Sequence, residues 1–317
     1  MKISVIGTNF ISDALVEAVR LEGRAEIHSV FSRKLDTGSC FAEKHGIKRV
    51  FTDLDEMLSS EDLDAVYVAS PTVCHESHAI ASLKAEKHVL CEKALSTDYS
   101  SARRMLDVAR ASGKVLLEAM RPVHDPFYNT VRSALPRIGK IRRAHLEYCQ
   151  YSSRYDRFKS GILTNAFDVN MKNSALSDIG IYPFTVAVFL FGEPSSLCQA
   201  SVRLDNGFDG SGSLLLAYPE MTATVAYSKI TDSTTPSVIE GELGSIHIDK
   251  LSAPSSFTLI LRDGTRETIT APPVPNNMIY EVSDFIDIVE RRLDGTPYFN
   301  LTESVMRLLD KRLSPYD

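Results

Sequence analysis

The sequence predicts an α/β protein in which a doubly wound parallel sheet is followed by an α+β domain with an antiparallel or mixed sheet. Up to about Arg121, short apolar runs alternate with segments whose apolar residues recur at helical spacing, as in a parallel sheet wrapped by helices on both faces. After Pro122 the strand-like runs are longer, alternate in polarity and are joined by Gly, Asn and Asp turns. We therefore expect a first domain over residues 1–121 and a second over residues 122–317.

Length and composition support two folded domains and exclude several classes of protein. A chain of 317 residues exceeds one ordinary core, and its net charge of -6, with Lys and Arg scattered, offers no basic stripe for nucleic acid. The five cysteines lie far apart without zinc spacing, so we expect reduced thiols and no metal. Met1 leads directly into a strand and no apolar run reaches membrane-spanning length, so we expect a cytoplasmic protein without membrane contact.

Each predicted strand of the first domain is a short apolar run closed by a breaker, and each predicted helix has amphipathic spacing. In chain order, the strands are residues 3–6, 26–31, 50–51, 64–69, 87–93 and 115–118. The helices between them are residues 11–19, 40–45, 54–58, 75–84 and 96–112. Because helices connect successive strands, the strands are expected to run parallel.

The second domain is predicted to consist mainly of strands that alternate in polarity. These strands are residues 142–151, 197–204, 212–217, 222–227, 237–240, 245–249 and 257–261. The helices are residues 125–135, 178–191 and 280–292. So few helices cannot cover both faces of the sheet, and we expect another subunit to cover one of them.

The strand at residues 87–93 ends in a carboxylate and an amine, Glu92 and Lys93. In an open α/β sheet, ligands bind at the carboxyl ends of the strands. The alternative is an ordinary surface Glu–Lys pair, and the motifs on either side favour a binding site.

A glycine turn follows the first strand. Gly7 makes the turn, and Thr8, Asn9, Phe10 and Ile11 lead into the helix. Only the first glycine of a G-x-G-x-x-G fingerprint is present, but the amino terminus of the helix can still receive a pyrophosphate through its backbone N–H groups.

The second strand ends in Ser32, Arg33 and Lys34, near the position where an acidic residue usually binds the ribose 2′-hydroxyl. Two cations and a hydroxyl fit a 2′-phosphate, so this turn favours NADP(H) over NAD(H). The alternative is a solvated basic turn.

The fourth strand is followed by Ser70, Pro71 and Thr72, and His75 opens the next helix. This loop is expected to lie against the nicotinamide half of a dinucleotide. A histidine in that position is also common as a cap at a helix start.

Four motifs occur in one order along the chain: Gly7-Thr8-x-x-Ile11, Asp64-x-Val66-x-Val68-x-Ser70-Pro71-x-x-x-His75, Lys87-His88-Val89-Leu90-Cys91-Glu92-Lys93 and Leu176-Ser177-Asp178-Ile179-Gly180-Ile181-Tyr182. In this order they resemble the Gfo/Idh/MocA family of NAD(P)-dependent oxidoreductases. The resemblance implies an amino-terminal Rossmann domain and a carboxyl-terminal domain with an open-faced, mostly antiparallel sheet, which often forms homodimers or homotetramers. It also implies substrates among sugars, inositols, dihydrodiols and related polyols.

The resemblance assigns the family's catalytic lysine to Lys93 and its second catalytic region to Asp178 and Tyr182. A tyrosine at the latter position is similar to the glucose-fructose oxidoreductase and dimeric dihydrodiol dehydrogenase branch, because the inositol-dehydrogenase type has histidine there. The chain departs from the family at Asn9, where the second glycine is missing, at Asn173-Ser174 and at Ala94, which replaces a proline. Because a cis bond before a residue other than proline costs about 2.5–4 kcal/mol, we expect a trans Lys93–Ala94 bond.

Hydride transfer at a carbinol carbon requires a partner that takes or gives the hydroxyl proton. A tyrosine whose pKa is lowered by a neighbouring ammonium can serve, so we expect Lys93 and Tyr182 to form the proton-transfer pair. Asp178, four residues earlier on the predicted helix, could orient substrate hydroxyls. The alternative for Tyr182 is a core aromatic, and the alternative for the protein is a sugar sensor or regulatory binder that binds NADP without turnover.

Overall fold

The computed structural model of the chain describes residues 1–311, and they divide into two compact units. The first unit comprises Met1–His124 and Pro275–Met306. The second comprises Asp125–Val274 and the described residues from Arg307 onward. The segment Pro275–Met306 therefore belongs with the first unit, whereas the sequence-based expectation placed it with the second.

Hydrophobic packing explains why this segment returns to the first unit. Helix α10 (Met278–Val289) buries Val282, Phe285 and Ile286 completely in the core formed by strand β1 and helix α1. The amphipathic spacing of a helix shows that one face is buried, but it does not show which core receives that face.

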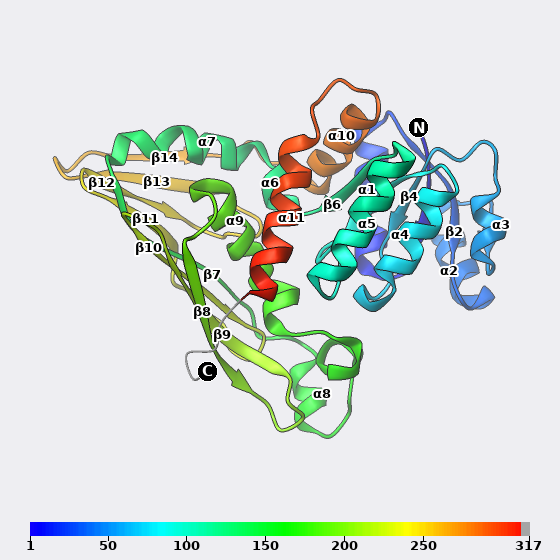
Figure 1. The fold of residues 1–317 in the computed structure, drawn as a ribbon, viewed down its shortest axis with the longest axis horizontal. Coiled ribbons are helices and arrows are strands. Elements are labelled where there is room, and N and C mark those ends of the chain that lie inside the picture. The colour runs from blue at the N-terminus through cyan, green and yellow to red at the C-terminus, as the bar shows by residue number, and fades with distance from the viewer. Residues whose placement is uncertain (312–317) are drawn as a thin grey trace. The chain divides into compact units, whose positions relative to one another are not determined.

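The first unit contains a six-stranded parallel sheet with the order β3-β2-β1-β4-β5-β6. Figure 1 labels its strands β2, β4 and β6. Its strands are β1 (Lys2–Ile6), β2 (Glu26–Phe31), β3 (Val50–Phe51), β4 (Ala65–Val68), β5 (His88–Glu92) and β6 (Leu116–Ala119). The order reverses between β1 and β4, so the crevice for a ligand is expected at the carboxyl ends of these two strands. The predicted doubly wound parallel sheet is confirmed.

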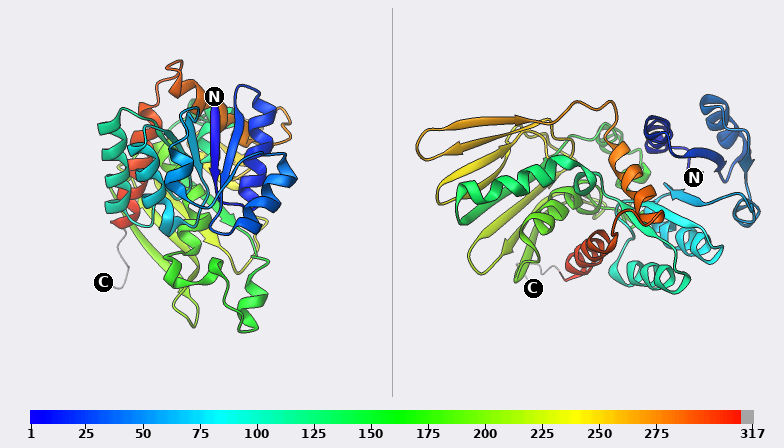
Figure 2. Two further views of the ribbon diagram at one scale, coloured as in Figure 1. Left: turned by 90° about the vertical axis from the view of Figure 1, so that its right-hand side faces the viewer. Right: turned by 90° about the horizontal axis from the view of Figure 1, so that it is seen from above.

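Helices cover both faces of this sheet (Figure 2). They are α1 (Phe10–Glu22), α2 (Leu35–His45), α3 (Leu54–Leu58), α4 (His75–Lys84), α5 (Tyr99–Ser112), the short α6 (Arg121–His124), α10 and the beginning of α11 (Thr296–Asp310). α1 packs beside α10, and α4 packs beside α5 on the opposite face. α11 was not predicted from the sequence.

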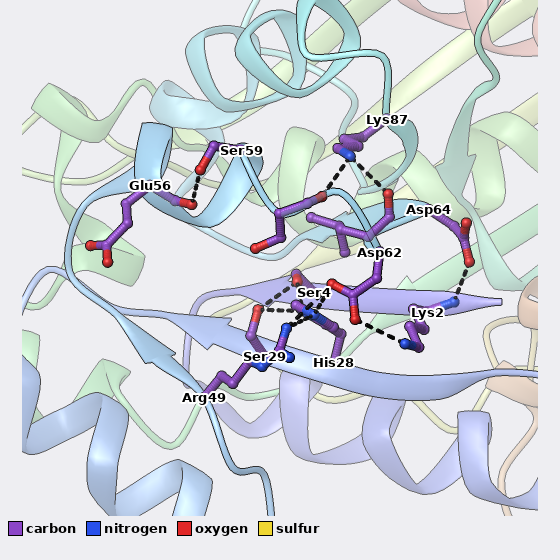
Figure 3. A network of polar contacts seen from close by, with 12 residues as sticks. Lys2, Ser4, His28, Ser29, Arg49, Glu56, Ser59, Asp62, Asp64 and Lys87 are labelled. Carbon is purple, nitrogen blue, oxygen red and sulfur yellow. Dashed lines mark hydrogen bonds and ion pairs between the residues drawn. The ribbon is translucent and has the colours of Figure 1, made fainter.

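The amino-terminal edge of the parallel sheet is held by a polar network centred on Asp62 (Figure 3). One carboxylate oxygen of Asp62 lies 2.9 Å from Lys2 Nζ, and the other lies 3.0 Å from His28 Nε2. The Lys2 ammonium and His28 hold the pKa of this carboxyl well below its ordinary value. These interactions are at the edge opposite to the predicted binding site, so they support the fold and leave the other edge open for a ligand.

The second unit is built on an eight-stranded sheet with the order β14-β13-β12-β11-β7-β10-β9-β8. Only the β7–β10 pair is parallel, so the sheet is mostly antiparallel, as predicted. Its strands are β7 (Ile141–Cys149), β8 (Ser196–Arg203), β9 (Asp209–Ala217), β10 (Thr222–Ser228), β11 (Ser237–Gly241), β12 (Gly244–Ile248), β13 (Ser256–Leu261) and β14 (Arg266–Thr270). β14 was missed because its exposed side chains are mostly polar, as is common for an edge strand.

Helices of the second unit pack against one face of its sheet. They are α7 (Pro126–Ala134) and α9 (Ile181–Phe191), whereas the short α8 (Tyr155–Lys159) has no buried residue and stacks its Tyr155 and Phe158 rings on Phe167. Leu146, Leu214 and Val225 on the inner face are fully buried, whereas Leu215 and Val202 are 50% and 57% exposed. Within the part of this unit that the structure describes, no helix lies over the face that carries Leu215.

The Lys93–Ala94 peptide bond is cis, so the expectation of a trans bond is wrong. Hydrogen bonds from neighbouring elements hold this segment. The carbonyl oxygen of Ala94 lies 3.1 Å from the buried His75 Nδ1, and the Leu95 N–H donates to Glu118.

No helix among the described residues is long and apolar enough to cross a membrane.

Candidate active site

The glycine turn after β1 has the geometry of a phosphate-binding loop. Gly7 has φ 112°, and a Cβ there would lie 2.7 Å from the carbonyl oxygen of Ala69, so only glycine fits. The thirteen-residue helix α1 begins three residues later and points its amino terminus toward the loop. Thr8 is partly exposed, and the Phe10 side chain is 70% exposed. This cradle fits the pyrophosphate of a dinucleotide.

Asn9 stands at the second glycine position of the fingerprint, and its side chain has two structural partners. Its Oδ1 accepts hydrogen bonds from the N–H groups of Ile11 and Ser12, which caps α1. Its Nδ2 donates to the carbonyl oxygen of Ala69 at 2.9 Å. The amide therefore ties the turn to the end of β4, and its Oδ1 occupies two N–H groups at the same helix end that a pyrophosphate would approach.

The cationic turn follows β2 as predicted. Arg33 and Lys34 are exposed and Ser32 is partly buried, so the turn presents two cations and a hydroxyl at the carboxyl edge of the sheet. Burial lowers the pKa of the His78 imidazole, and the positive charge of Arg33 lowers it further.

His75 joins the loop after β4 to the segment that contains Lys93. This histidine is 1% exposed, and burial lowers its pKa to about 4. Its Nε2 lies 2.9 Å from the carbonyl oxygen of Ser70, and its Nδ1 faces the carbonyl oxygens of Ala94 and Leu95. Since both ring nitrogens face the backbone, His75 supports the site by joining two of its loops.

Other residues of this loop remain open to a ligand. Pro71 is exposed, and Thr72 is partly exposed at the start of a short 3₁₀ turn, Thr72–Cys74. The Ser70 hydroxyl lies 2.9 Å from His78 Nδ1. His78 was not singled out from the sequence, although it lies one helical turn after His75.

Strand β5 ends at a buried carboxyl group. Glu92 is 9% exposed, and the Tyr67 hydroxyl donates to its Oε1 at 2.5 Å. The Lys93 N–H donates to its Oε2 at 3.3 Å. Burial raises the pKa of Glu92, and the bond from Tyr67 and the charges of Lys93 and Arg121 oppose that shift. Glu92 therefore anchors the strand end beneath Lys93.

Two further carboxyl groups, which the sequence analysis missed, surround this strand end. Glu118, the third residue of β6, is 4% exposed, and burial raises its pKa to about 7. Glu281 on α10 is fully buried, and neither carboxyl oxygen has a hydrogen-bond partner among the described residues. Burial and the charge of Glu92 raise the pKa of Glu281 well above its ordinary value. In the sequence, the position of Glu118 at the end of an apolar run was the feature that could have indicated a buried carboxyl group.

Asp178 and Tyr182 of the second unit lie on one continuous helical segment, which begins as a π-helix and continues as an α-helix. Leu176–Gly180 is a π-helix that continues into α9, so the predicted single α-helix from residue 178 is wrong in its first turn. Gly180 allows this segment to lie against β10, because a Cβ there would come within 2.8 Å of the Tyr227 ring. π-helical turns are frequent at functional sites.

Asp178 forms a close ion pair that the sequence did not reveal. Its Oδ2 lies 2.6 Å from Nζ of Lys229, which follows the end of β10. The Lys229 side chain is 5% exposed, whereas the Asp178 side chain is 34% exposed. In the sequence, the position of Lys229 directly after an apolar strand could have indicated a buried lysine. Its partner Asp178 could not be identified in this way, because it lies 51 residues away along the chain.

Tyr182 is buried in the second unit, with its ring edge-on to Tyr148 at a centroid distance of 5.6 Å. The structure thus brings Asp178 together with Lys229 and places Tyr182 beside Tyr148. Lys93 belongs to the first unit, and its pairing with Tyr182 stays a prediction.

Comparisons with known proteins agree with this geometry. Residues 1–120 match a family model described as "Oxidoreductase family, NAD-binding Rossmann fold", and residues 130–247 match a "GFO/IDH/MocA C-terminal domain". The scyllo-inositol 2-dehydrogenase (NADP(+)) of Bacillus subtilis is 38% identical over 93% of this chain and 90% of that protein. The human trans-1,2-dihydrobenzene-1,2-diol dehydrogenase is 25% identical over 95% of this chain and 91% of that protein.

Solved structures show the same fold. A 3-ketoreductase from Actinomadura kijaniata, in complex with NADP and TDP-benzene, has a TM-score of 0.87, and the match covers 99% of this chain and 98% of that one. At 23% sequence identity, this likeness concerns the fold alone.

Proposed function

Because this chain belongs to the GFO/IDH/MocA family of oxidoreductases, we propose that it is an NADP-dependent dehydrogenase or reductase of a small neutral polyol, sugar, diol or ketone. The main support is the 38% identity, over almost the whole chain, to a scyllo-inositol 2-dehydrogenase that uses NADP(+). The tyrosine at position 182 also supports diols as substrates, so inositols and cyclic diols are the first compounds to test.

The cofactor is proposed to bind along the carboxyl edge of the parallel sheet and to supply or accept a hydride there. The Gly7 turn and the amino terminus of α1 would hold the pyrophosphate. Arg33 and Lys34 would bind the 2′-phosphate with charge-assisted hydrogen bonds, and this turn contains no carboxylate that would repel it. These residues account for a preference for NADP(H) over NAD(H).

The proton is proposed to move through Lys93 and Tyr182. A lysine ammonium beside a phenol favours the phenolate, which can take the hydroxyl proton in oxidation and return it in reduction. Asp178 would accept hydrogen bonds from substrate hydroxyls and so orient the reacting carbon. No metal is needed for this chemistry, and the described residues contain no group of side chains able to hold one.

The open face of the second unit's sheet is proposed to bind a second copy of the chain, in a homodimer or homotetramer. A row of neighbouring residues on that face comprises Leu215, Thr224, His145 and Val238. An open sheet face that carries exposed apolar side chains such as Leu215 and Val202 favours self-association. The five free thiols are typical of a reducing compartment, so we infer a cytoplasmic location.

The direct test is an assay of the purified protein with NADP⁺ or NADPH and a panel of inositols, cyclic diols, sugars and dicarbonyls. Absorbance of the reduced nicotinamide reports turnover. We expect at least one neutral polyol or its ketone to be converted. Tight binding of NADPH, with no turnover across the panel, would contradict the enzyme and favour a sugar sensor or regulatory binder.

A further inference from the structure

Lys229 is a buried lysine whose backbone is fixed on both sides. Its N–H donates to the carbonyl oxygen of Gly210 at 2.9 Å, and its own carbonyl oxygen accepts from Ser152 at the same distance. Lysine is almost never fully buried unless it is paired. The rigid backbone and the 5% exposure of this side chain therefore point to a specific task for its ammonium group.

The ammonium group is surrounded by defined partners. It donates to Asp178 Oδ2 at 2.6 Å and to the carbonyl oxygen of Ala166 at 3.1 Å. It also lies 5.0 Å from the ring centroid of Phe167 and 5.6 Å from that of Phe208. Two charge-assisted hydrogen bonds and two aromatic faces stabilise the cation away from water.

The two members of the pair differ in their access to solvent. Lys229 is enclosed, whereas the side chain of Asp178 is 34% exposed. A ligand at this site would meet the carboxylate, and the cation behind it would remain out of reach. A carboxylate accepts hydrogen bonds only, so it favours hydroxyl donors and disfavours carboxylate or phosphate groups.

We propose that Lys229 is a positioning and specificity residue that fixes the Asp178 carboxylate to receive substrate hydroxyls and thereby selects neutral polyols over anionic sugars. This inference rests on the proposed function, because it assigns Asp178 to substrate binding. The bond to Ala166 extends the arrangement, since the same ammonium joins the π-helix, the end of β10 and the 3₁₀ turn Asn165–Phe167.

The first measurement is a double-mutant cycle with Lys229→Met, Asp178→Asn and the double variant, followed by urea unfolding. Each single change removes the ion pair between the two side chains and leaves the charge of the other, so we expect a lower urea midpoint for both. The double variant should recover much of that loss. Additive losses would show that the two side chains are not coupled and would overturn the inference.

Lys159 provides a matched control. It pairs with Asp156 at 2.7 Å and lies over the rings of Tyr151 and Tyr155, but both members of the pair are more than half exposed. Exposed pairs contribute little to stability. Lys159→Met is expected to leave the urea midpoint and the kinetics unchanged, which separates the effect of a buried pair from that of any lysine over aromatic rings.

The second measurement uses scyllo-inositol as the neutral probe and glucuronate as the anionic one. Lys229→Met is expected to raise KM or Kd for scyllo-inositol about 10–100-fold, with an unchanged Kd for NADPH. Lys229→Arg, which keeps the cation, should recover part of this loss. Asp178→Asn should increase binding of glucuronate relative to scyllo-inositol, because it removes the negative charge and leaves the cation.

The outcomes separate the inference from the proposed function. If the wild-type protein turns over a polyol and Lys229→Met retains its KM and its discrimination against glucuronate, the inference fails and the proposed function stands. If the wild-type protein neither binds a polyol nor turns one over, the proposed function fails and the inference fails with it. If Lys229→Met does not fold, Lys229→Gln, which keeps a hydrogen-bond donor and the Asp178 carboxylate but removes the buried positive charge, repeats the binding comparison.

Discussion

The backbone N–H of Leu95, which lies two residues beyond Lys93, donates a hydrogen bond to Glu118 Oε1 at 2.8 Å. The second carboxyl oxygen of Glu118 accepts from the Thr302 hydroxyl at 2.9 Å. Glu118 thus joins β6 to the Lys93 segment and to α11 within the first unit. Burial raises the pKa of this carboxyl to about 7, so its protonation changes in the neutral range.

Glu118→Gln is expected to change the pH dependence of stability. The folded-state pKa of about 7 exceeds the ordinary value of 4.5, so the native protein binds more protons between these pH values and loses stability as pH rises through them. The loss is about 3 kcal/mol above pH 7. Glutamine can accept from the Leu95 N–H with its carbonyl oxygen and donate to the Thr302 hydroxyl with its amide group, and it does not ionise. The difference in stability between the variant and the wild type should therefore favour the variant more at pH 8 than at pH 5.

Urea unfolding at the two pH values measures this difference. Glu26→Gln, at the exposed start of β2, is the control and should follow the wild-type profile. Parallel profiles for Glu118→Gln and wild type would contradict the prediction.

Arg33→Ala and Lys34→Ala are expected to weaken NADPH binding about 10-fold or more and to leave NADH binding nearly unchanged, because each removes a cation that is proposed to bind the 2′-phosphate. Calorimetric titration of both cofactors measures this. Lys48→Ala, an exposed cation elsewhere in the first unit, is the control. A wild-type protein that binds NADH as tightly as NADPH would rule out the proposed preference.

Tyr182→Phe is expected to lower kcat about 10²–10⁴-fold while Kd for NADPH stays nearly constant, because it removes the proposed proton-transfer group and keeps the ring. Lys93→Met should cause a similar loss. The double variant should lose less than the product of the two effects, because both residues are proposed to act on one proton.

Tyr148→Phe is the matched control for Tyr182, because its ring packs edge-on against Tyr182 and it has no proposed role in proton transfer. It should keep kcat within a few-fold of wild type. Undiminished turnover by the Lys93→Met/Tyr182→Phe double variant would exclude the proposed pair.

Leu215→Lys is expected to dissociate the proposed oligomer, because it places a charge on the open sheet face, on the strand next to the edge strand β8. Light scattering at micromolar concentration measures the mass. Leu163→Lys is the control, since Leu163 is similarly exposed, at 55%, but lies outside the sheet. A wild-type protein that is already monomeric under these conditions would disprove the proposed interface.

Much of the fold could be predicted from the sequence because its signals are local. The buried strands of the first unit are apolar runs, and the turn at Gly7 needs a residue without a side chain. Arg33 and Lys34 are recognisable by their distance from that turn. Such features depend on neighbouring residues, so a pattern in the chain is enough to locate them.

The tertiary structure decided which distant side chains share one environment. Asp178 and Lys229 are 51 residues apart, and burial of the lysine couples them. Burial also made Glu118 a group that titrates near neutral pH, and contacts from outside the segment accompany the cis bond after Lys93. The sequence by itself determined most of the strands and helices and the edge of the parallel sheet at which a ligand is expected, although it did not reveal β14 or α11. Packing determined the charges and partners there, because desolvation and hydrogen bonding depend on all the elements that surround a side chain.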